Sequence, residues 1–321
     1  MTNIALIGVG VSGLSFLSFI NRKKFNIEIF EKSRGFSGRL STRRTECGKF
    51  DHGAQFFTIK NNIFKEFLLS NFSGFLKKYE PSIKYNNHGV LENFANSTHY
   101  YFSGGMNSFG KTLGKKFNAS LNTKIKSIKK TSKNKWQLIF DGNYISKGTF
   151  DYVVSSAPFD QTRDIYLSNF PFDEKFAMRP CITLMVGFKT FHDDVYPYQK
   201  FHYDSNLDSL FYQNYKFNDN KLHCWVIQAK AQWSINNFEL PDEKIISELL
   251  SKLKIIFGTK KPEFLQLHKW RFASTSKNKF ENEIASNSAN LFAIGDWVSG
   301  GRVEGAFLSG YRLAKHFNET I

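Results

Sequence analysis

Six residues near the start of the chain, Gly8-Val9-Gly10-Val11-Ser12-Gly13, have the G-x-G-x-x-G spacing of a turn that binds dinucleotide phosphates. The first glycine permits a tight bend, the second leaves room for a pyrophosphate, and the third allows helix and strand to pack closely. The free N–H groups at the start of the following helix can bind the anion. This turn therefore predicts a dinucleotide site that the rest of the chain must complete.

A carboxylate, Glu31, stands 18 residues after Gly13, directly after a second apolar run at residues 26–30. At that distance a carboxylate can accept hydrogen bonds from both hydroxyls of an adenosine ribose. The same negative charge would repel a 2′-phosphate, so the sequence argues against NADP in this position.

A polar loop, residues 32–43, follows Glu31 and carries several basic side chains. Arg39 is the best candidate for a two-pronged contact with phosphate oxygens, whereas Arg34 and Arg43 could equally be surface charges. Further along, residues 53–55 combine small side chains, which let the backbone approach a flat ligand, with Gln55, which has both a donor and an acceptor.

The end of the chain offers a second carboxylate at the end of a strand. Residues 290–294 form an apolar run that ends in Gly295-Asp296, and a glycine-rich loop and a helix with small residues on one side follow. In open α/β sheets, ligands bind at the carboxyl ends of strands. We therefore expect Asp296 and the start of the helix, near Val303, to lie against the ligand.

Apolar periodicity predicts the elements that position these residues. The expected strands cover residues 4–7, 26–30, 119–128, 136–140, 151–155, 182–188, 210–215, 223–229 and 290–294. The expected helices cover residues 14–20, 64–72, 106–113, 241–257 and 303–317, and a turn is expected at residues 86–89. The two ends of the chain have an α/β pattern, while the strand-rich middle followed by a helix indicates an α+β domain with an antiparallel sheet.

The amino-acid composition restricts the kinds of molecule that the protein is expected to bind. The 321 residues are 41% hydrophobic and 17% aromatic, enough for a sizeable core, and 44 Lys or Arg against 28 Asp or Glu give a net charge of +16. Such a charge could attract nucleic acid, a membrane surface or phosphorylated small molecules. The lysine-rich stretch 124–135 lacks interleaved aromatic residues, which favours a solvated basic face over a nucleic-acid site.

Cysteine use and hydropathy predict the compartment. Cys47, Cys181 and Cys224 lie far apart and form no C-x-x-C motif, so neither a disulfide framework nor a metal site is expected. The N-terminus has no basic region and its apolar run is the first expected strand, so no signal peptide is expected, and no stretch approaches about 18 uninterrupted apolar residues. We therefore expect a cytoplasmic protein without a membrane partner.

Together these motifs resemble those of the flavin amine-oxidase superfamily, most closely its renalase-like FAD/NAD-dependent oxidoreductases. The matching segments follow the family order along nearly the whole chain: residues 8–13, 31–35, 38–39, 51–58, 225–226, 233–234, 270–271 and 295–306. The resemblance implies a discontinuous Rossmann-type FAD-binding domain, of α/β class, formed by residues 1–60, 95–160 and 285–321. Residues 61–94 and 161–284 would form the inserted α+β substrate domain with an antiparallel sheet.

The resemblance also implies a place for each part of the cofactor. The glycine turn and Glu31 would hold the ADP half of FAD, Arg39 its pyrophosphate, and Ile125 the adenine. Residues 54–55 would lie near the flavin ring, Asp296 beside the ribityl–phosphate region, and the last helix against the pyrimidine. The expected cofactor-binding residues are Gly8, Gly10, Val11, Ser12, Gly13, Glu31, Lys32, Arg39, Ala54, Gln55, Phe56, Ile125, Gly295, Asp296, Arg302 and Val303.

Five residues are candidates for the wall of a pocket that takes a flat substrate: Phe56, Phe57, Trp225, Trp270 and His268. Taken alone, such an aromatic residue is more often part of the core, and such a histidine more often has a structural role. No acid–base pair is evident, and hydride transfer between stacked rings needs position more than a strong acid or base.

The resemblance implies an FAD-dependent oxidase that takes hydride from a reduced nitrogen heterocycle, foremost a mis-reduced dihydronicotinamide dinucleotide. Reoxidation by O2 would give H2O2. The alternatives are an amine oxidase or desaturase and, in another class, a non-catalytic nucleotide-binding or nucleic-acid-binding protein.

The chain departs from the family pattern in three places. Ser37 replaces one of two glycines before Arg39, no residue matches the active-site lysine of many amine oxidases, and no cysteine lies in a flavin-attachment context. Noncovalent FAD is therefore expected.

Overall fold

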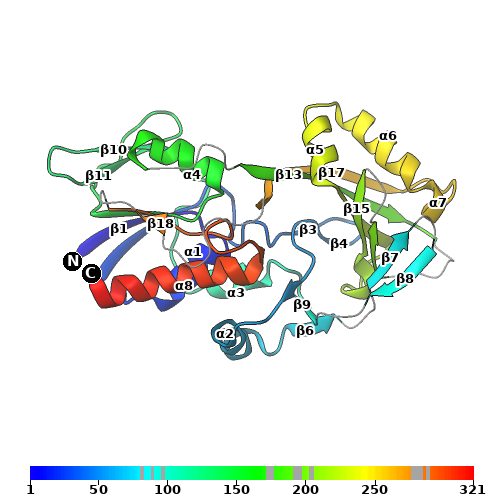
Figure 1. Ribbon diagram of the computed structural model, residues 1–321, viewed down its shortest axis with the longest axis horizontal. Helices are drawn as coiled ribbons and strands as arrows, with labels where there is room; N and C mark the ends of the chain where they lie inside the picture. The colour runs from blue at the N-terminus through cyan, green and yellow to red at the C-terminus, as the bar shows by residue number, and fades with distance from the viewer. Residues whose placement is uncertain are drawn as a thin grey trace.

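The computed structural model describes residues 1–79, 83–87, 90–94, 98–170, 177–190, 197–201, 206–275, 285–286 and 290–321. Two sheets lie at opposite ends of the long axis, and both ends of the chain belong to one of them (Figure 1). None of the helices in the described ranges combines the length and apolar character that a bilayer crossing requires.

The first sheet has five strands in the order β18-β19-β12-β1-β2, parallel except for the β18–β19 pair. Its strands are β1 (Thr2–Ile7), β2 (Phe25–Phe30), β12 (Tyr152–Ser155), β18 (Ala285–Ser286) and β19 (Leu291–Ala293). The inner strand β1 is apolar at successive positions because both of its faces are covered. Ile4 and Leu6 belong to one hydrophobic cluster, and Ala5 and Ile7 belong to another.

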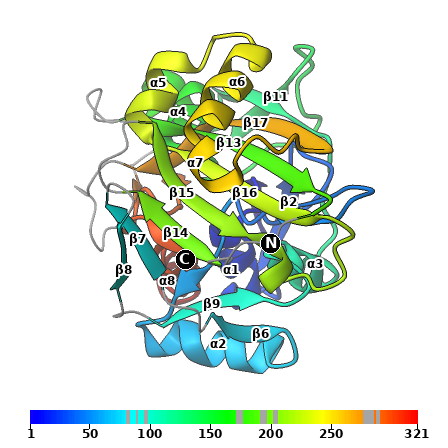
Figure 2. The same ribbon diagram turned by 90° about the vertical axis from the view of Figure 1, so that its right-hand side faces the viewer.

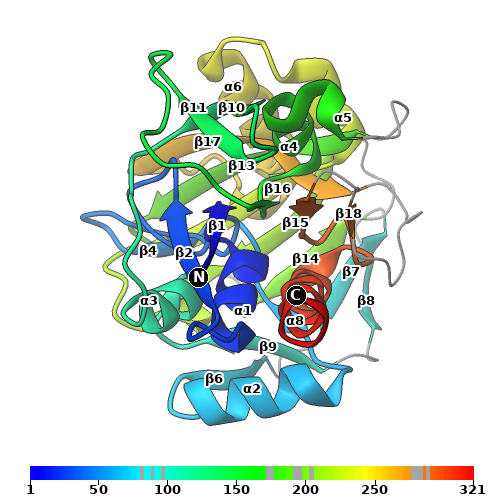
Figure 3. The same ribbon diagram turned by 90° about the vertical axis from the view of Figure 1, so that its left-hand side faces the viewer.

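Two helices from opposite ends of the chain cover one face of this sheet. They are α1 (Val11–Phe19) and α8 (Arg302–Thr320), which lie side by side (Figure 3). The other face packs against α4 (Phe159–Tyr166) and a hairpin of β10 (Ile125–Lys130) and β11 (Trp136–Phe140), through the cluster that contains Trp136 and Tyr166. The sheet therefore has the two covered faces typical of a Rossmann-type domain.

The second sheet has seven strands in the order β17-β13-β16-β15-β14-β7-β8. They are β7 (Ile83–Asn87), β8 (Val90–Phe94), β13 (Met178–Phe188), β14 (Tyr198–Phe201), β15 (Leu207–Tyr212), β16 (His223–Ala229) and β17 (Phe264–Thr275). Neighbours pair antiparallel, except β14 and β7, which run parallel. Figure 2 shows α5 (Ala231–Asn237), α6 (Asp242–Lys252) and α7 (Lys254–Phe257) over this sheet.

Short elements connect the two sheets. They are β3 (Thr42–Arg44), β4 (Lys49–Asp51), β5 (Phe57–Thr58), α2 (Asn62–Phe72), β6 (Leu76–Tyr79), β9 (His99–Phe102), α3 (Ser108–Gly114), and the 3-10 turns η1 (Leu167–Asn169) and η2 (Gln213–Tyr215). The β3–β4 hairpin matters most for the site, because it leads from the first sheet to the buried segment Asp51–Gln55.

Several predicted elements have different bounds. The strand expected at residues 119–128 begins only at Ile125, and the strand expected at 210–215 ends at Tyr212, where η2 begins. The single helix expected at 241–257 is divided at Leu253 into α6 and α7. Of the turn predicted at residues 86–89, the first two residues lie in β7 and the last two lie outside the described ranges.

Candidate functional site: a cavity between the two sheets

A cavity of about 2380 Å³ lies at the carboxyl ends of β1, β2, β12 and β19 and continues to β13, β16 and β17 of the second sheet. Pockets for small ligands commonly measure roughly 300–1,000 Å³. The cavity is therefore large enough for a long dinucleotide and a second flat molecule beside it.

The glycine turn has the geometry that a pyrophosphate requires. Gly8 has a φ of +93°, and a Cβ on Gly13 would lie 2.5 Å from the carbonyl oxygen of Gly8, so chain packing requires both glycines. A Cβ on Gly10 would meet nothing within 4 Å. Gly10, Val11 and Ser12 all line the cavity. The space above Gly10 and the first turn of α1 therefore fits an anionic group.

The carboxylate of Glu31 is fixed in place at the end of β2. One oxygen accepts the N–H of Val9 at 2.9 Å and the other accepts the N–H of Ser33 at 2.8 Å. Glu31 is buried and lines the cavity together with Lys32 and Ile125. Because each carboxylate oxygen has two acceptor positions, Glu31 can still bind the hydroxyls of a ribose.

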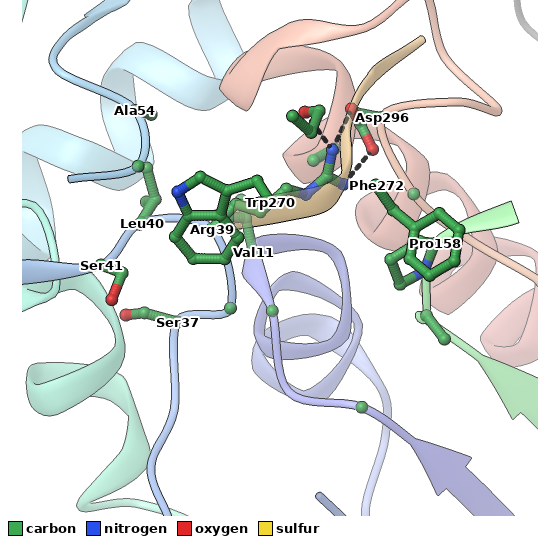
Figure 4. Close-up of a pocket in the computed structure, with 18 of the residues that line it drawn as sticks. Val11, Ser37, Arg39, Leu40, Ser41, Ala54, Pro158, Trp270, Phe272 and Asp296 are labelled. Atoms are coloured by element: carbon green, nitrogen blue, oxygen red, sulfur yellow. Dashed lines mark hydrogen bonds and ion pairs between the residues drawn. The ribbon is translucent and has the colours of Figure 1, made fainter. Parts of the chain in front are cut away.

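Arg39 links the N-terminal part of the chain to the C-terminal part across the cavity (Figure 4). Its Nη2 lies 2.5 Å from Oδ1 of Asp296, and its Nη1 donates to Oδ2 of Asp296 at 3.0 Å and to the carbonyl of Ala273 at 2.9 Å. These contacts use three of the five guanidinium N–H donors. Two donors therefore stay available for a ligand in the cavity.

The segment Asp51–Gln55 is held by two strands of the second sheet and by the loop that carries Arg39. Trp270 in β17 donates its Nε1–H to the carbonyl of His52 at 2.9 Å, and Gln228 in β16 donates to the carbonyl of Gly53 at 2.9 Å. On the other side, the N–H of Ala54 donates to the carbonyl of Arg39 at 3.1 Å. The backbone at Gly53 and Ala54 is thus fixed where it lines the cavity.

Three rings form one wall of the cavity. His52 stacks on Trp270 with ring centroids 5.3 Å apart, and His268 meets the edge of Trp270 at 4.3 Å. Burial lowers the pKa of His52 to about 3, with smaller contributions from His268 and the Arg43 cation. Burial and Arg43 lower the pKa of His268 to about 4. Both imidazoles are therefore neutral at neutral pH and present a flat, uncharged surface.

The start of α8 closes the other side of the cavity. Gly301 and Arg302 have φ values of +74° and +65°, and a Cβ on Gly305 would lie 2.2 Å from the carbonyl oxygen of Ser299. Glu304 accepts the N–H groups of Lys60 and Asn61 at 2.7 and 2.9 Å. These contacts fix the start of α8. The positive end of the helix dipole lies there and can stabilise a negative charge on a ligand.

The structure brings most of the expected site residues to this one cavity. Those that line it are Gly8, Gly10, Val11, Ser12, Glu31, Lys32, Arg39, Ala54, Ile125, His268, Trp270, Gly295, Asp296, Arg302 and Val303. Gly13 lies behind the turn, where it allows α1 to approach β1, and does not line the cavity.

Four expected residues lie elsewhere. Trp225 and Phe57 are buried in hydrophobic clusters, Trp225 against Tyr212 and Phe57 against Phe102, because their strands turn these side chains to the core. Phe56 packs against His99 with ring centroids 4.2 Å apart. The side chain of Gln55 bonds to buried polar groups behind the cavity wall. None of the four is among the lining residues.

Sequence reasoning missed several residues of the site. Arg43 was left open as a surface charge but lines the cavity, and His52 was not singled out from its motif. Lys216 and Asp51 form a buried ion pair behind the wall, with Nζ and Oδ2 2.7 Å apart. No local pattern marks Lys216, because its partner is 165 positions away. Within the described ranges, no three His, Cys, Asp or Glu side chains are arranged to hold a metal ion.

The parallel sheet, glycine turn and cavity define a class of proteins built on a Rossmann-type domain that binds a dinucleotide. The model of the family described as flavin containing amine oxidoreductase matches residues 62–316, and that of the NAD(P)-binding Rossmann-like domain matches residues 6–68. The chain therefore belongs to the flavin containing amine oxidoreductase family, since the match covers most of its length.

Solved structures agree with this fold over nearly the whole chain. A provisionally named protoporphyrinogen oxidase from an Exiguobacterium species has a TM-score of 0.81 at 12% identity, covering 98% of each chain. A variant of putrescine oxidase has a TM-score of 0.76 at 12% identity, covering 99% of this chain and 98% of that one. An oxidoreductase from Methanosarcina mazei has a TM-score of 0.71 at 13% identity, covering 98% and 100%.

The predicted fold class and the predicted FAD cofactor are confirmed, and the protein is an FAD-dependent oxidoreductase. When bound, the flavin accepts two electrons and a proton from a substrate and passes them to an acceptor. The chain's own contribution is to bind the cofactor, to hold the substrate beside it and to exclude water.

Proposed function

We propose that the protein is a renalase-like oxidase that takes hydride from a reduced nitrogen heterocycle, foremost a mis-reduced dihydronicotinamide dinucleotide. One hydride leaves the dihydronicotinamide ring, and O2 takes up the two electrons with protons to form H2O2. The products are the oxidised dinucleotide and H2O2. FAD is held noncovalently by the cavity residues named above.

The charge of the cavity carries this choice of substrate. Twelve Lys or Arg residues line it against five Asp or Glu residues, a surplus of seven positive charges. A bound FAD pyrophosphate offsets only about two of these charges. The remaining surplus supports a substrate that is itself anionic, as a dinucleotide is.

Four of the five acidic residues that line the cavity are already engaged, among them Glu31, which accepts two backbone N–H groups, and the fifth, Asp164, is 72% exposed. Asp296 pairs with Arg39, Asp208 with Lys200 at 2.6 Å, and Glu304 with two backbone N–H groups. By contrast, Arg43 has no carboxylate within ion-pair distance among the described residues. A protonated amine would therefore meet cations without a carboxylate prepared for it.

The wall of His52, His268 and Trp270 supports a flat substrate. Two neutral imidazoles and an indole offer a surface on which a nicotinamide ring can lie face-on without electrostatic penalty. Position, rather than a proton donor, is what hydride transfer between stacked rings requires.

An amine oxidase is the second candidate, favoured by the family description and by the putrescine oxidase fold. Anaerobic stopped-flow mixing distinguishes the two. We expect reduced nicotinamide dinucleotide isomers to bleach the flavin and air to restore its colour with release of H2O2. Bleaching by primary amines alone would overturn the dinucleotide proposal.

Arg43 provides a sharper test of the same proposal. Arg43→Gln should raise KM for the dinucleotide about tenfold or more, with little change in kcat, because it removes an unpaired cation from the cavity wall. Arg271→Gln is the matched control, since Arg271 also lines the cavity but already pairs with Glu239 at 2.9 Å. Equal KM values for the two variants would contradict a role for Arg43 in binding an anion.

The division into domains and the cellular compartment are proposed as well. We propose that residues 1–60, 95–160 and 285–321 form the FAD-binding domain, that residues 61–94 and 161–284 form the substrate domain, and that the protein works in the cytoplasm. A desaturase or a protein that binds nucleotides or nucleic acid without catalysis would leave the flavin unreduced by dihydronicotinamides in the stopped-flow experiment.

A further inference from the structure

A fully buried ion pair lies directly behind the segment that lines the cavity. The side chains of Lys216 and Asp51 are 3% and 0% exposed, and their Nζ and Oδ2 atoms are 2.7 Å apart. The ammonium also donates to the main-chain oxygen of Gln55 at 2.9 Å and lies 3.3 Å from its Oε1. All three N–H donors of Lys216 therefore have acceptors within the stretch Asp51–Gln55.

Asp51 connects this ammonium to the first part of the chain. Its Oδ1 accepts the hydroxyl of Thr42 at 2.6 Å and the N–H of Met106 at 2.9 Å. Its own N–H donates to Gln213, whose amide also donates to Gln55 at 3.0 Å. The group joins β3, β4 and the segment before α3 to η2, which follows a strand of the second sheet.

Burying an ion pair costs free energy because both charges lose their hydration, so the pair must make a compensating structural or functional contribution. Burial lowers the pKa of Lys216, and the carboxylate of Asp51 opposes this shift. The hydrogen bonds of the pair indicate what this contribution is. It fixes both ends of the Asp51–Gln55 segment, while Trp270 and Gln228 hold the carbonyls between them.

We propose that Lys216 is a positioning residue that sets the backbone at Gly53 and Ala54 against the flavin ring from behind the cavity wall. This inference rests on the proposed place of Ala54 beside the flavin. Lys216 does not line the cavity, so it acts through the segment it holds rather than on the reacting atoms.

The test removes the pair without leaving a lone buried charge. In the double variant Lys216→Met with Asp51→Asn, the residue at position 51 keeps an oxygen for Thr42 and Met106 while the tie to Gln55 is lost. We expect FAD binding to weaken at least about tenfold, from the loss of two to three hydrogen bonds. The absorption band of the bound flavin should also shift towards that of free FAD.

A surface ion pair between the same parts of the chain is the matched control. Lys49 and Asp219 lie 2.5 Å apart, are 35% and 61% exposed, and also join β4 to the stretch after η2. The double variant Lys49→Met with Asp219→Asn should keep wild-type FAD affinity and flavin absorption, because an exposed pair contributes little.

A second variant covers the case in which the double variant does not fold. Lys216→Arg keeps the charge opposite Asp51 but places a larger, planar group in the same closed space, which displaces the segment. We expect a folded protein with a shifted flavin band and weakened FAD binding. Wild-type affinity and absorption in Lys216→Arg, or in the folded double variant, would overturn the proposal. Because both measurements use FAD without substrate, they are independent of which substrate is oxidised.

Discussion

At the scale of single residues, the glycines of the turn meet two different requirements: some are needed by the fold and one is needed by the ligand. Gly8 and Gly13 have neighbours that a Cβ would strike, so the protein chain itself needs them. Gly10 has no such neighbour and lines the cavity. Its lack of a side chain therefore serves the ligand and not the fold.

Gly10→Ala should weaken FAD binding and leave the apo protein as stable as the wild type, or slightly more stable. The added methyl group occupies the space of the pyrophosphate, while the loss of backbone freedom in the unfolded chain stabilises by about 0.4–1 kcal/mol. Calorimetric titration with FAD and urea unfolding of the apo protein measure the two effects. Gly148→Ala, another position with no atom within 4 Å of the added Cβ, is the control for unchanged affinity.

The buried histidines predict a dependence of stability on pH. The pKa values of His52 and His268 fall to about 3 and 4 on folding, from an ordinary value near 6.5. Below about pH 6.5 the unfolded chain binds protons that the folded chain does not, so their contribution to stability is lost as pH falls towards 4.

The free energy of unfolding should therefore decline between pH 6.5 and 4, and less steeply in His52→Phe than in the wild type. Urea unfolding at several pH values measures both slopes. Parallel slopes in the two proteins would show that His52 is protonated in the folded state, contrary to its burial.

At the scale of elements, the small residues of α8 explain how the two ends of the chain come together. A Cβ on Gly310 would lie 2.1 Å from the carbonyl oxygen of Ser12 and 2.8 Å from the nitrogen of Phe16. The backbones of α8 and α1 therefore touch at this point, and no side chain fits between them. Both helices begin at the cavity, so their spacing affects its shape.

Gly310→Ala should push the two helices apart and lower the free energy of unfolding by about 1–3 kcal/mol, with weaker FAD binding as a consequence. Lys315→Ala, an exposed position on the same helix, should change neither quantity appreciably. Denaturant unfolding with and without FAD measures both. A stable Gly310→Ala protein with unchanged FAD affinity would mean that α8 can shift without disturbing the cavity.

The sequence predicted the elements near the cofactor better than those of the second sheet. Continuous apolar runs that end at a glycine turn marked β1 and β19, because a parallel strand is buried on both faces. The 12-residue strand β17 was not predicted. It is the edge strand of the sheet and pairs only with β13, and charged residues such as Lys269 and Arg271 interrupt its apolar sequence. The parallel pairing of β7 with β14 depends on contacts between residues more than a hundred positions apart.

The cavity itself was predicted only in part, for the same physical reason. Motif residues that bind a ligand through the backbone, such as Gly10, are recognisable from local spacing. The places of Lys216 and Trp225 cannot be recognised from local spacing, because the direction of each side chain depends on how strands distant in sequence pair and pack. Trp225 thus faces the core, while Lys216, in a polar stretch, is fully buried.

At the scale of the whole molecule, the pair between Arg39 and Asp296 joins the two parts of the chain that flank the cavity. Arg39→Lys keeps the charge but loses the two-pronged contact and the two spare N–H donors. We expect FAD to bind at least about tenfold more weakly, the loss of one charge-assisted hydrogen bond. Arg22→Lys, at an exposed position that does not line the cavity, should bind FAD normally, and equal affinities of the two variants would exclude Arg39 from the cofactor site.

The position of β1 in the sheet has a consequence for biosynthesis. This strand is synthesised before β12 and β19, and the sheet is complete only with β19, some 285 residues later. At roughly 5–20 residues per second, translation reaches β19 about 15 to 60 s after β1. A nascent chain therefore has no complete binding site for FAD until β19 and α8 have been synthesised.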